Sequence, residues 1–70
     1  MSMSERIRIV LIKRKMTVTA LAERLNISPQ NLTNKLKRDN FTEVELREIA
    51  AAMDCTFEAA FALNDTGEKV

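Results

Sequence analysis

The stretch NISPQNLTNKLKR, residues 26–38, contains the clearest helix start in the chain. The hydroxyl of Ser28 can accept hydrogen bonds from free backbone N–H groups, which makes it a good helix cap. Pro29 fits the first helical position because the N–H that it lacks would be unpaired there anyway. Leu32 and Leu36 are four residues apart and therefore share one helix face. The stretch predicts a short helix over 29–38 with these two leucines buried.

The opposite side of this helix carries uncharged hydrogen-bonding side chains. With the leucines turned inward, helical geometry turns outward Pro29, Gln30, Thr33, Asn34 and Lys37. Amides donate and accept together and so match the N6/N7 edge of adenine, while threonine can contact thymine. Lys37 and Arg38 at the far end suit phosphates. A polar helix face in water explains the same residues equally well, so the helix alone leaves both interpretations open.

Two helices are expected before this stretch. Ser4 is the predicted cap of a helix over 4–15, whose inward face would be Ile7, Val10, Leu11 and Arg14, with a second apolar edge of Ile9, Ile12 and Met16. Thr17 is the predicted cap of a helix over 18–25, with Leu21, Ala22 and Leu25 inward. Asn26 tolerates a left-handed backbone, which a tight turn between helices often needs, and Ile27 would fill the core beneath that turn.

Two further helices are expected after it. Thr42 and Glu45 have the spacing of a capping box, and Phe41 and Leu46 that of a hydrophobic staple. The helix that begins there would bury Leu46, Ile49, Ala50 and Met53. Thr56 is the predicted cap of a fifth helix over 57–63, with Phe57, Ala60 and Phe61 facing the core. Residues 64–70 are polar and are expected to be a frayed tail.

These patterns predict an all-α fold, a compact five-helix bundle in one domain over residues 1–63. Long alternation with period two is missing, and Gly67 is the only glycine, so strands and hairpins have little support. A chain of 70 residues has room for one core and buries only about 60% of the surface of its unfolded form.

Charge is strongly segregated along the chain. Residues 1–38 contain nine basic and two acidic side chains, a balance of +7, whereas residues 39–70 contain eight acidic and two basic ones, a balance of −6. Segregation of this kind indicates one half that faces a polyanion and another that faces solvent or a partner. Ordinary solvated helix faces are the alternative explanation.

Several classes of protein lack support in the composition. Without histidine, and with Cys55 as the only cysteine, the chain has no disulfide framework, no usual metal-ligand set and no recognisable catalytic set, so we expect no enzyme, metal or cofactor. Cys55 has apolar neighbours and is interpreted as a small buried hydrophobe. The apolar run 9–12 is far shorter than a membrane span, and the N-terminus has no signal-peptide layout, so the expected location is the cytoplasm.

The chain resembles the Cro/C1-type (XRE-like) helix-turn-helix DNA-binding domain over residues 4–63, with the motif at about 18–37. The matching positions are Thr17, Leu21, Ala22, Leu25, Ile27, Ser28, Leu32, Leu46, Ile49, Ala50, Met53, Cys55 and Phe57. The resemblance implies five helices in the arrangement of the lambda repressor, with the third in the major groove and the second across the backbone of double-stranded DNA. It implies base reading by Gln30, Thr33 and Asn34, and backbone contacts from Thr17, Thr19, Ser28, Lys35, Lys37 and Arg38.

Four departures from the family pattern stand out. Asn26 replaces the usual turn glycine, and Val18 replaces a common glutamine at the start of the second helix. A glycine after the third helix is replaced by the stretch 37–40, in which Asp39 and Asn40 could supply another turn. Many members bury an arginine of the first helix against a glutamate of the third, whereas this chain has Leu11 and Leu36. Replacing both partners leaves no lone buried charge, and we expect the two leucines to touch.

Two functions follow from these observations. The first is a small transcriptional regulator that binds specific DNA sequences, and the alternative is a protein-interaction module, antitoxin-like or adaptor, that keeps the scaffold without reading DNA. A single helix reads few base pairs, so useful affinity normally needs two copies on half-sites about 34 Å apart. The edge of Ile9, Ile12 and Met16 and the helix over 57–63 are both candidates for a homodimer contact, and both also fit ordinary core. For the homodimer contact, the helix over 57–63 or the tail that follows it is preferred.

Overall fold

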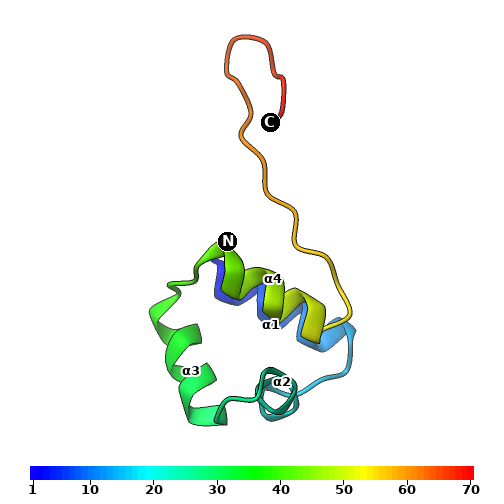
Figure 1. The fold of residues 1–70 in the computed structure, drawn as a ribbon, viewed down its shortest axis with the longest axis vertical. Coiled ribbons are helices and arrows are strands. Elements are labelled where there is room, and N and C mark those ends of the chain that lie inside the picture. Colours follow the sequence, from blue (N-terminus) through cyan, green and yellow to red (C-terminus); the bar gives the residue numbers. More distant parts are fainter.

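The computed structural model describes all residues, 1–70, and has four helices. They are α1 (Met3–Lys13), α2 (Val18–Leu25), α3 (Pro29–Arg38) and α4 (Glu43–Ala52). Figure 1 shows α2 and α3 at one end of the molecule, while the chain after α4 projects as an arm from the opposite end. The all-α class is therefore confirmed, but with four helices rather than five.

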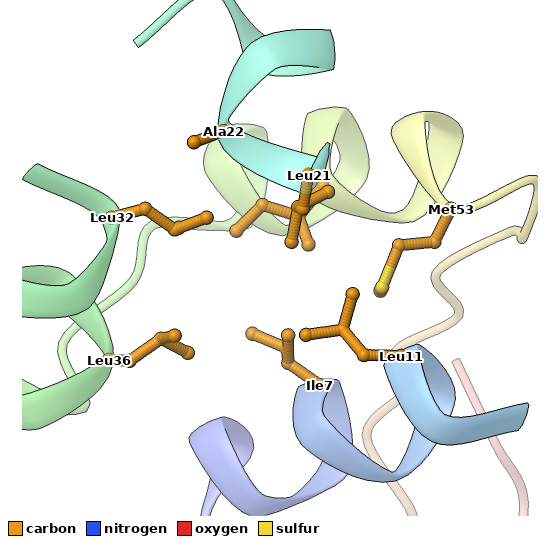
Figure 2. Close-up of a cluster of buried hydrophobic side chains, with 8 residues drawn as sticks. Ile7, Leu11, Leu21, Ala22, Leu32, Leu36 and Met53 are labelled. Atoms are coloured by element: carbon orange, nitrogen blue, oxygen red, sulfur yellow. The ribbon is translucent and has the colours of Figure 1, made fainter. Parts of the chain in front are cut away.

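The core lies at the centre of the four helices. Its eight buried side chains are Ile7, Leu11, Leu21, Ala22, Leu32, Leu36, Ile49 and Met53. Leu21 and Leu32 are completely buried, and Figure 2 shows side chains from α1, α2, α3 and the end of α4 converging on one point. The expected inward placement of the two α3 leucines is confirmed, and it fixes which side of α3 faces water.

Most helix boundaries follow the predicted caps. Ser28 accepts a hydrogen bond from the Asn31 N–H at 3.1 Å, and Thr17 accepts one from the Ala20 N–H at 3.0 Å. Thr42 and Glu45 form the reciprocal capping box. Asn26 has φ 61°, the left-handed conformation expected of the turn between α2 and α3. These caps occupy N–H groups that the first turn of a helix leaves unpaired.

The start of α1 differs from the prediction. Ser2, not Ser4, caps the helix by accepting from the Glu5 N–H. Ser4 is buried instead: its hydroxyl donates to the Leu36 carbonyl at 2.6 Å, and its N–H donates to the Asp39 carboxylate at 2.8 Å. These two bonds tie the first turn of α1 to the end of α3, an interaction between residues far apart in sequence.

The turns that follow α1 and α3 each contain a residue with a left-handed backbone. Asp39, with φ 52°, ends α3 and confirms that this part of the 37–40 stretch supplies a turn in place of glycine. The first helix stops at Lys13 rather than Lys15, because Lys15 itself adopts φ 54°. Arg14, expected on the inward face, is exposed and donates to the Asp54 carbonyl at 2.9 Å.

The second apolar edge of α1 is only partly used by the core. Met16 is half-buried and packs against the core cluster, whereas Ile12 is 76% exposed and Ile9 is 38% exposed. Ile9 and Ile12 therefore remain on the surface of α1.

The predicted fifth helix is wrong. Residues 55–60 are not helical, and the segment beyond them turns back on itself in a short hairpin with a single bridge between Ala62 and Lys69. Seven residues are too few to hold a helix unless one face is packed against the body. Only Phe57 is even half-buried, whereas Ala60 and Phe61 are exposed, so that packing is missing. We call residues 57–70 the C-terminal arm.

Leu11 and Leu36, at the two positions where the pattern of the resembled family has a buried ion pair, are both core residues. They are only 4% and 3% exposed. In Figure 2 the Ile7 side chain lies between them, so all three share one apolar region. Direct contact between the two leucines remains a prediction.

Replacing Leu36 with glutamate should destabilise the fold severely. A lone carboxylate would enter an apolar region with no basic partner, at a cost of about 3–5 kcal/mol. Urea denaturation measures the change, and Leu36→Met, which keeps volume and apolarity, is the matched control. A near-normal unfolding midpoint for Leu36→Glu would contradict the burial described above.

Ser4→Ala should cost about 1–3 kcal/mol of stability, because the buried Leu36 carbonyl would lose its hydroxyl donor. Ser2→Ala should act differently, removing a solvent-exposed cap and costing about 1 kcal/mol. Thermal denaturation of both variants checks the comparison. An equal or smaller loss for Ser4→Ala would show that the bond from Ser4 contributes little.

Candidate nucleic-acid interface

The exposed face of α3 presents two amides that are joined to each other. Gln30 and Asn34 are both exposed, and the Gln30 Nε2 donates to the Asn34 Oδ1 at 3.1 Å. This bond leaves the Gln30 oxygen and the Asn34 NH₂ group unbound, so the pair still offers both an acceptor and donors. Thr33 lies beside them and is half-buried. Three predicted base-reading residues thus occupy the water-facing side of one helix.

The end of α3 is basic. Lys37 and Arg38 are exposed, and neither forms an ion pair within the chain. Basic side chains in the last turn also stabilise a helix by interacting with its dipole. Their charges nevertheless remain accessible to an anionic ligand.

Lys35 is placed differently from these two residues. Its ammonium group forms an ion pair with Glu45, which links α3 to the first turn of α4. The hydrogen bond from Lys35, followed by one from the Thr42 backbone, lowers the pKa of the Glu45 carboxyl from 4.5 to about 2. The ammonium group of Lys35 is therefore paired with another residue of the chain, whereas that of Lys37 forms no ion pair.

The hydroxyl groups predicted to contact a nucleic-acid backbone lie at two helix starts. Thr17 and Ser28 each use a lone pair of the hydroxyl oxygen in capping, and their hydroxyl hydrogens remain available as donors. Thr19 is exposed in the first turn of α2. These three groups come from the two consecutive helices α2 and α3.

Two arginines have roles that sequence reasoning missed. Arg24 donates to the Ala52 carbonyl at 3.0 Å, and Arg14 donates to the Asp54 carbonyl at 2.9 Å. The Ala52 carbonyl is at the end of α4, where helical partners run out, and the Asp54 carbonyl is in the turn that follows the helix. The partners are 28 and 40 residues apart, so no local sequence signal could have shown them. Part of the basic half of the chain thus holds α4 in place.

Apart from the exposed face of α3, the structure was compared with the requirements of a metal site, a membrane span and a ligand pocket. The chain has no group of three or more histidine, cysteine, aspartate or glutamate residues placed to hold a metal ion. None of the helices combines the length and the apolar character that crossing a membrane would take. The largest hollow is an open, mostly apolar groove of about 200 Å³, formed by α1, α4 and the start of the C-terminal arm.

Comparison with known proteins identifies the fold family. The family model described as the Cro/C1-type HTH DNA-binding domain matches residues 6–65, which is nearly the whole chain. Searches of curated proteins and of solved structures found no significant match.

The ion pair between Lys35 and Glu45 should make stability depend on acid pH. Because folding lowers the pKa of Glu45, its contribution is fully present above the ordinary value of 4.5 and is lost as the pH falls through about 2. Glu45→Gln should therefore be less stable than the parent at pH 7, and the difference should shrink between pH 4.5 and 2.

Urea denaturation at several pH values measures this difference. Glu48→Gln is the matched control, since Glu48 is exposed on the same helix and forms no ion pair. A difference for Glu45→Gln that stays constant from neutral to strongly acid pH would contradict the linkage.

Proposed function

The chain belongs to the Cro/C1-type HTH DNA-binding domain family, and we propose that it is a small transcriptional regulator that binds specific duplex DNA sequences with α3 in the major groove. The observation that carries this proposal is the two-sided character of α3. Leu32 and Leu36 are buried, while the joined amides of Gln30 and Asn34 face water. Such a helix can enter a groove without exposing the core.

Base reading is assigned to Gln30, Asn34 and Thr33. A glutamine or asparagine amide can bond both N6 and N7 of adenine, and the threonine methyl can contact the methyl of thymine. The bond between Gln30 and Asn34 supports this assignment because it reduces the freedom of both side chains before DNA arrives. Less conformational entropy is then lost on binding.

Phosphate contacts are assigned to the surroundings of these residues. Lys37 and Arg38 supply free positive charge, while Thr17, Thr19 and Ser28 supply hydroxyl donors at helix starts. Lys35 is also assigned to this set. Its ammonium group would be shared between Glu45 and a phosphate. Contacts of this kind position a protein on DNA without reading its sequence.

Two copies are expected to act together, as a homodimer in the compartment that holds the DNA. A helix of ten residues contacts only a few base pairs, which is too little information for a useful site. Two copies on half-sites one helical turn apart double the contact and give a palindromic target.

Selection of bound duplexes from a random pool defines the preferred sequence, and variants then test the roles. Gln30→Ala and Asn34→Ala should each relax preference at one base position and cost about 1–3 kcal/mol on the preferred site. Lys37→Ala should weaken binding to all sequences alike. Lys13→Ala, an exposed lysine on α1, is the matched control and should change neither property.

The salt dependence of binding separates this proposal from the protein-interaction module. Binding that neutralises phosphates should weaken with salt at a log–log slope of about −0.9 per phosphate. Absence of duplex binding at low salt would refute the regulator and favour the interaction module. Equal affinity for all duplexes would refute base reading by α3.

A further inference from the structure

The C-terminal arm folds on itself with few bonds. Phe61 and Val70 exchange two backbone hydrogen bonds of 2.8 Å, and the Leu63 N–H donates to the Glu68 carbonyl at 2.8 Å. Gly67, with φ 76°, closes the turn in a left-handed conformation that suits glycine. The arm is thus a two-stranded hairpin that leaves the body at the end opposite α2 and α3 (Figure 1).

This hairpin buries almost none of its own apolar surface. Phe61 is 82% exposed and Val70 is 74% exposed. Both residues form one hydrogen-bonded pair, so their side chains lie on the same face of the hairpin, together with Leu63. Two isolated strands are marginally stable in water, and a third strand or a packed face is normally needed.

One edge of the hairpin is open for pairing. Phe61 and Leu63 use their backbone groups inside the hairpin, so the backbone groups of Ala60 and Ala62 point away from it, and these make no hydrogen bond within the chain. Their side chains are small and uncharged. The other edge carries Lys69, a residue type that protects strand edges from pairing.

We propose that the strand around Ala60 and Ala62 pairs with the same strand of a second copy, antiparallel, about a two-fold axis at Phe61. In this register Ala60 of each copy lies opposite Ala62 of the other, and each such pair exchanges two backbone hydrogen bonds. The two Phe61 residues face each other as a non-hydrogen-bonded pair with Cα atoms about 4.5 Å apart. The result is a four-stranded sheet built from two hairpins.

Several observations favour a second copy as the partner. A two-fold pairing makes the same strand serve both sides, as in isologous dimers. The register places Glu58 opposite Asn64, so no like charges face each other directly. The two Phe61 and two Val70 side chains form one continuous apolar face, and aromatic pairs of this kind stabilise sheets.

This arm-to-arm contact would be the interface of the proposed homodimer. Its role in DNA binding rests on the proposed function. Since the arm leaves from the end opposite α2 and α3, pairing does not use the exposed amides of Gln30 and Asn34. Association can therefore be measured in the absence of DNA.

Sedimentation equilibrium of the full chain tests the proposal. The parent should be a concentration-dependent dimer, and Phe61→Ser should raise the dissociation constant about 30-fold or more, as truncating a central aromatic anchor does. Ile12→Ser is the matched control, because Ile12 is comparably exposed, at 76%, but lies on α1. It should leave the dimer unchanged.

Two proline variants test which edge pairs. Ala62→Pro removes an outward N–H that the proposed sheet needs, whereas Lys69→Pro removes one from the opposite edge. Neither residue donates inside the hairpin, so the arm should survive in both variants. Dissociation by Ala62→Pro alone is the expected result. Dissociation by Lys69→Pro alone would overturn the proposed edge.

A monomeric parent at near-millimolar concentration, or a dimer lost through Ile12→Ser but kept in Phe61→Ser, would overturn the proposal. Binding of each variant to a single half-site duplex is measured in parallel. A monomer that still binds the half-site would leave the regulator standing and remove only the arm contact. An arm-dependent dimer that binds no DNA would leave the arm contact standing and remove the regulator.

Discussion

Burial of Leu32 and Leu36 against the body is the constraint on which the rest of the structure depends. Both leucines lie on one face of a ten-residue helix, so their burial fixes how α3 is rotated about its own axis. That rotation places Gln30 and Asn34 in water and turns Lys35 toward Glu45 on α4. A rotation of one residue, about 100°, would bury an amide or expose a leucine. Core packing and the presentation of the α3 amides are therefore one property of the same helix.

Sequence reasoning predicted the parts of the fold that local chemistry controls. The caps at Thr17, Ser28 and Thr42 depend on atoms within three residues, and all three were confirmed. Ser4 was misassigned because its partners, Leu36 and Asp39, are more than thirty residues away. The fifth helix failed for a related reason: its apolar residues have helical spacing, but spacing does not show whether a surface exists for them to cover. Where tertiary contacts decide, one sequence gives too little information.

The candidate site shows the same division. The outward direction of Gln30, Thr33 and Asn34 follows from helical geometry once the buried leucines are known. Two kinds of contact follow only from the folded chain: the pairing of Lys35 with Glu45, and the bonds from Arg24 and Arg14 to carbonyls at the end of α4 and in the turn after it. Counting charges along the sequence therefore overstates how much of the basic half is free for a polyanion. The free charge on α3 itself is concentrated at its end, on Lys37 and Arg38.

Small size links stability, association and binding in this chain. The four helices enclose a core of only eight side chains, and the C-terminal arm adds almost no buried apolar surface to it. A domain of this size has a modest margin of stability, so any contact that binds only the folded form raises that margin by mass action. Pairing of arms would do so at the end opposite α2 and α3, and duplex DNA would do so at α3. Because both contacts select the same folded body, each would stabilise the form that the other requires.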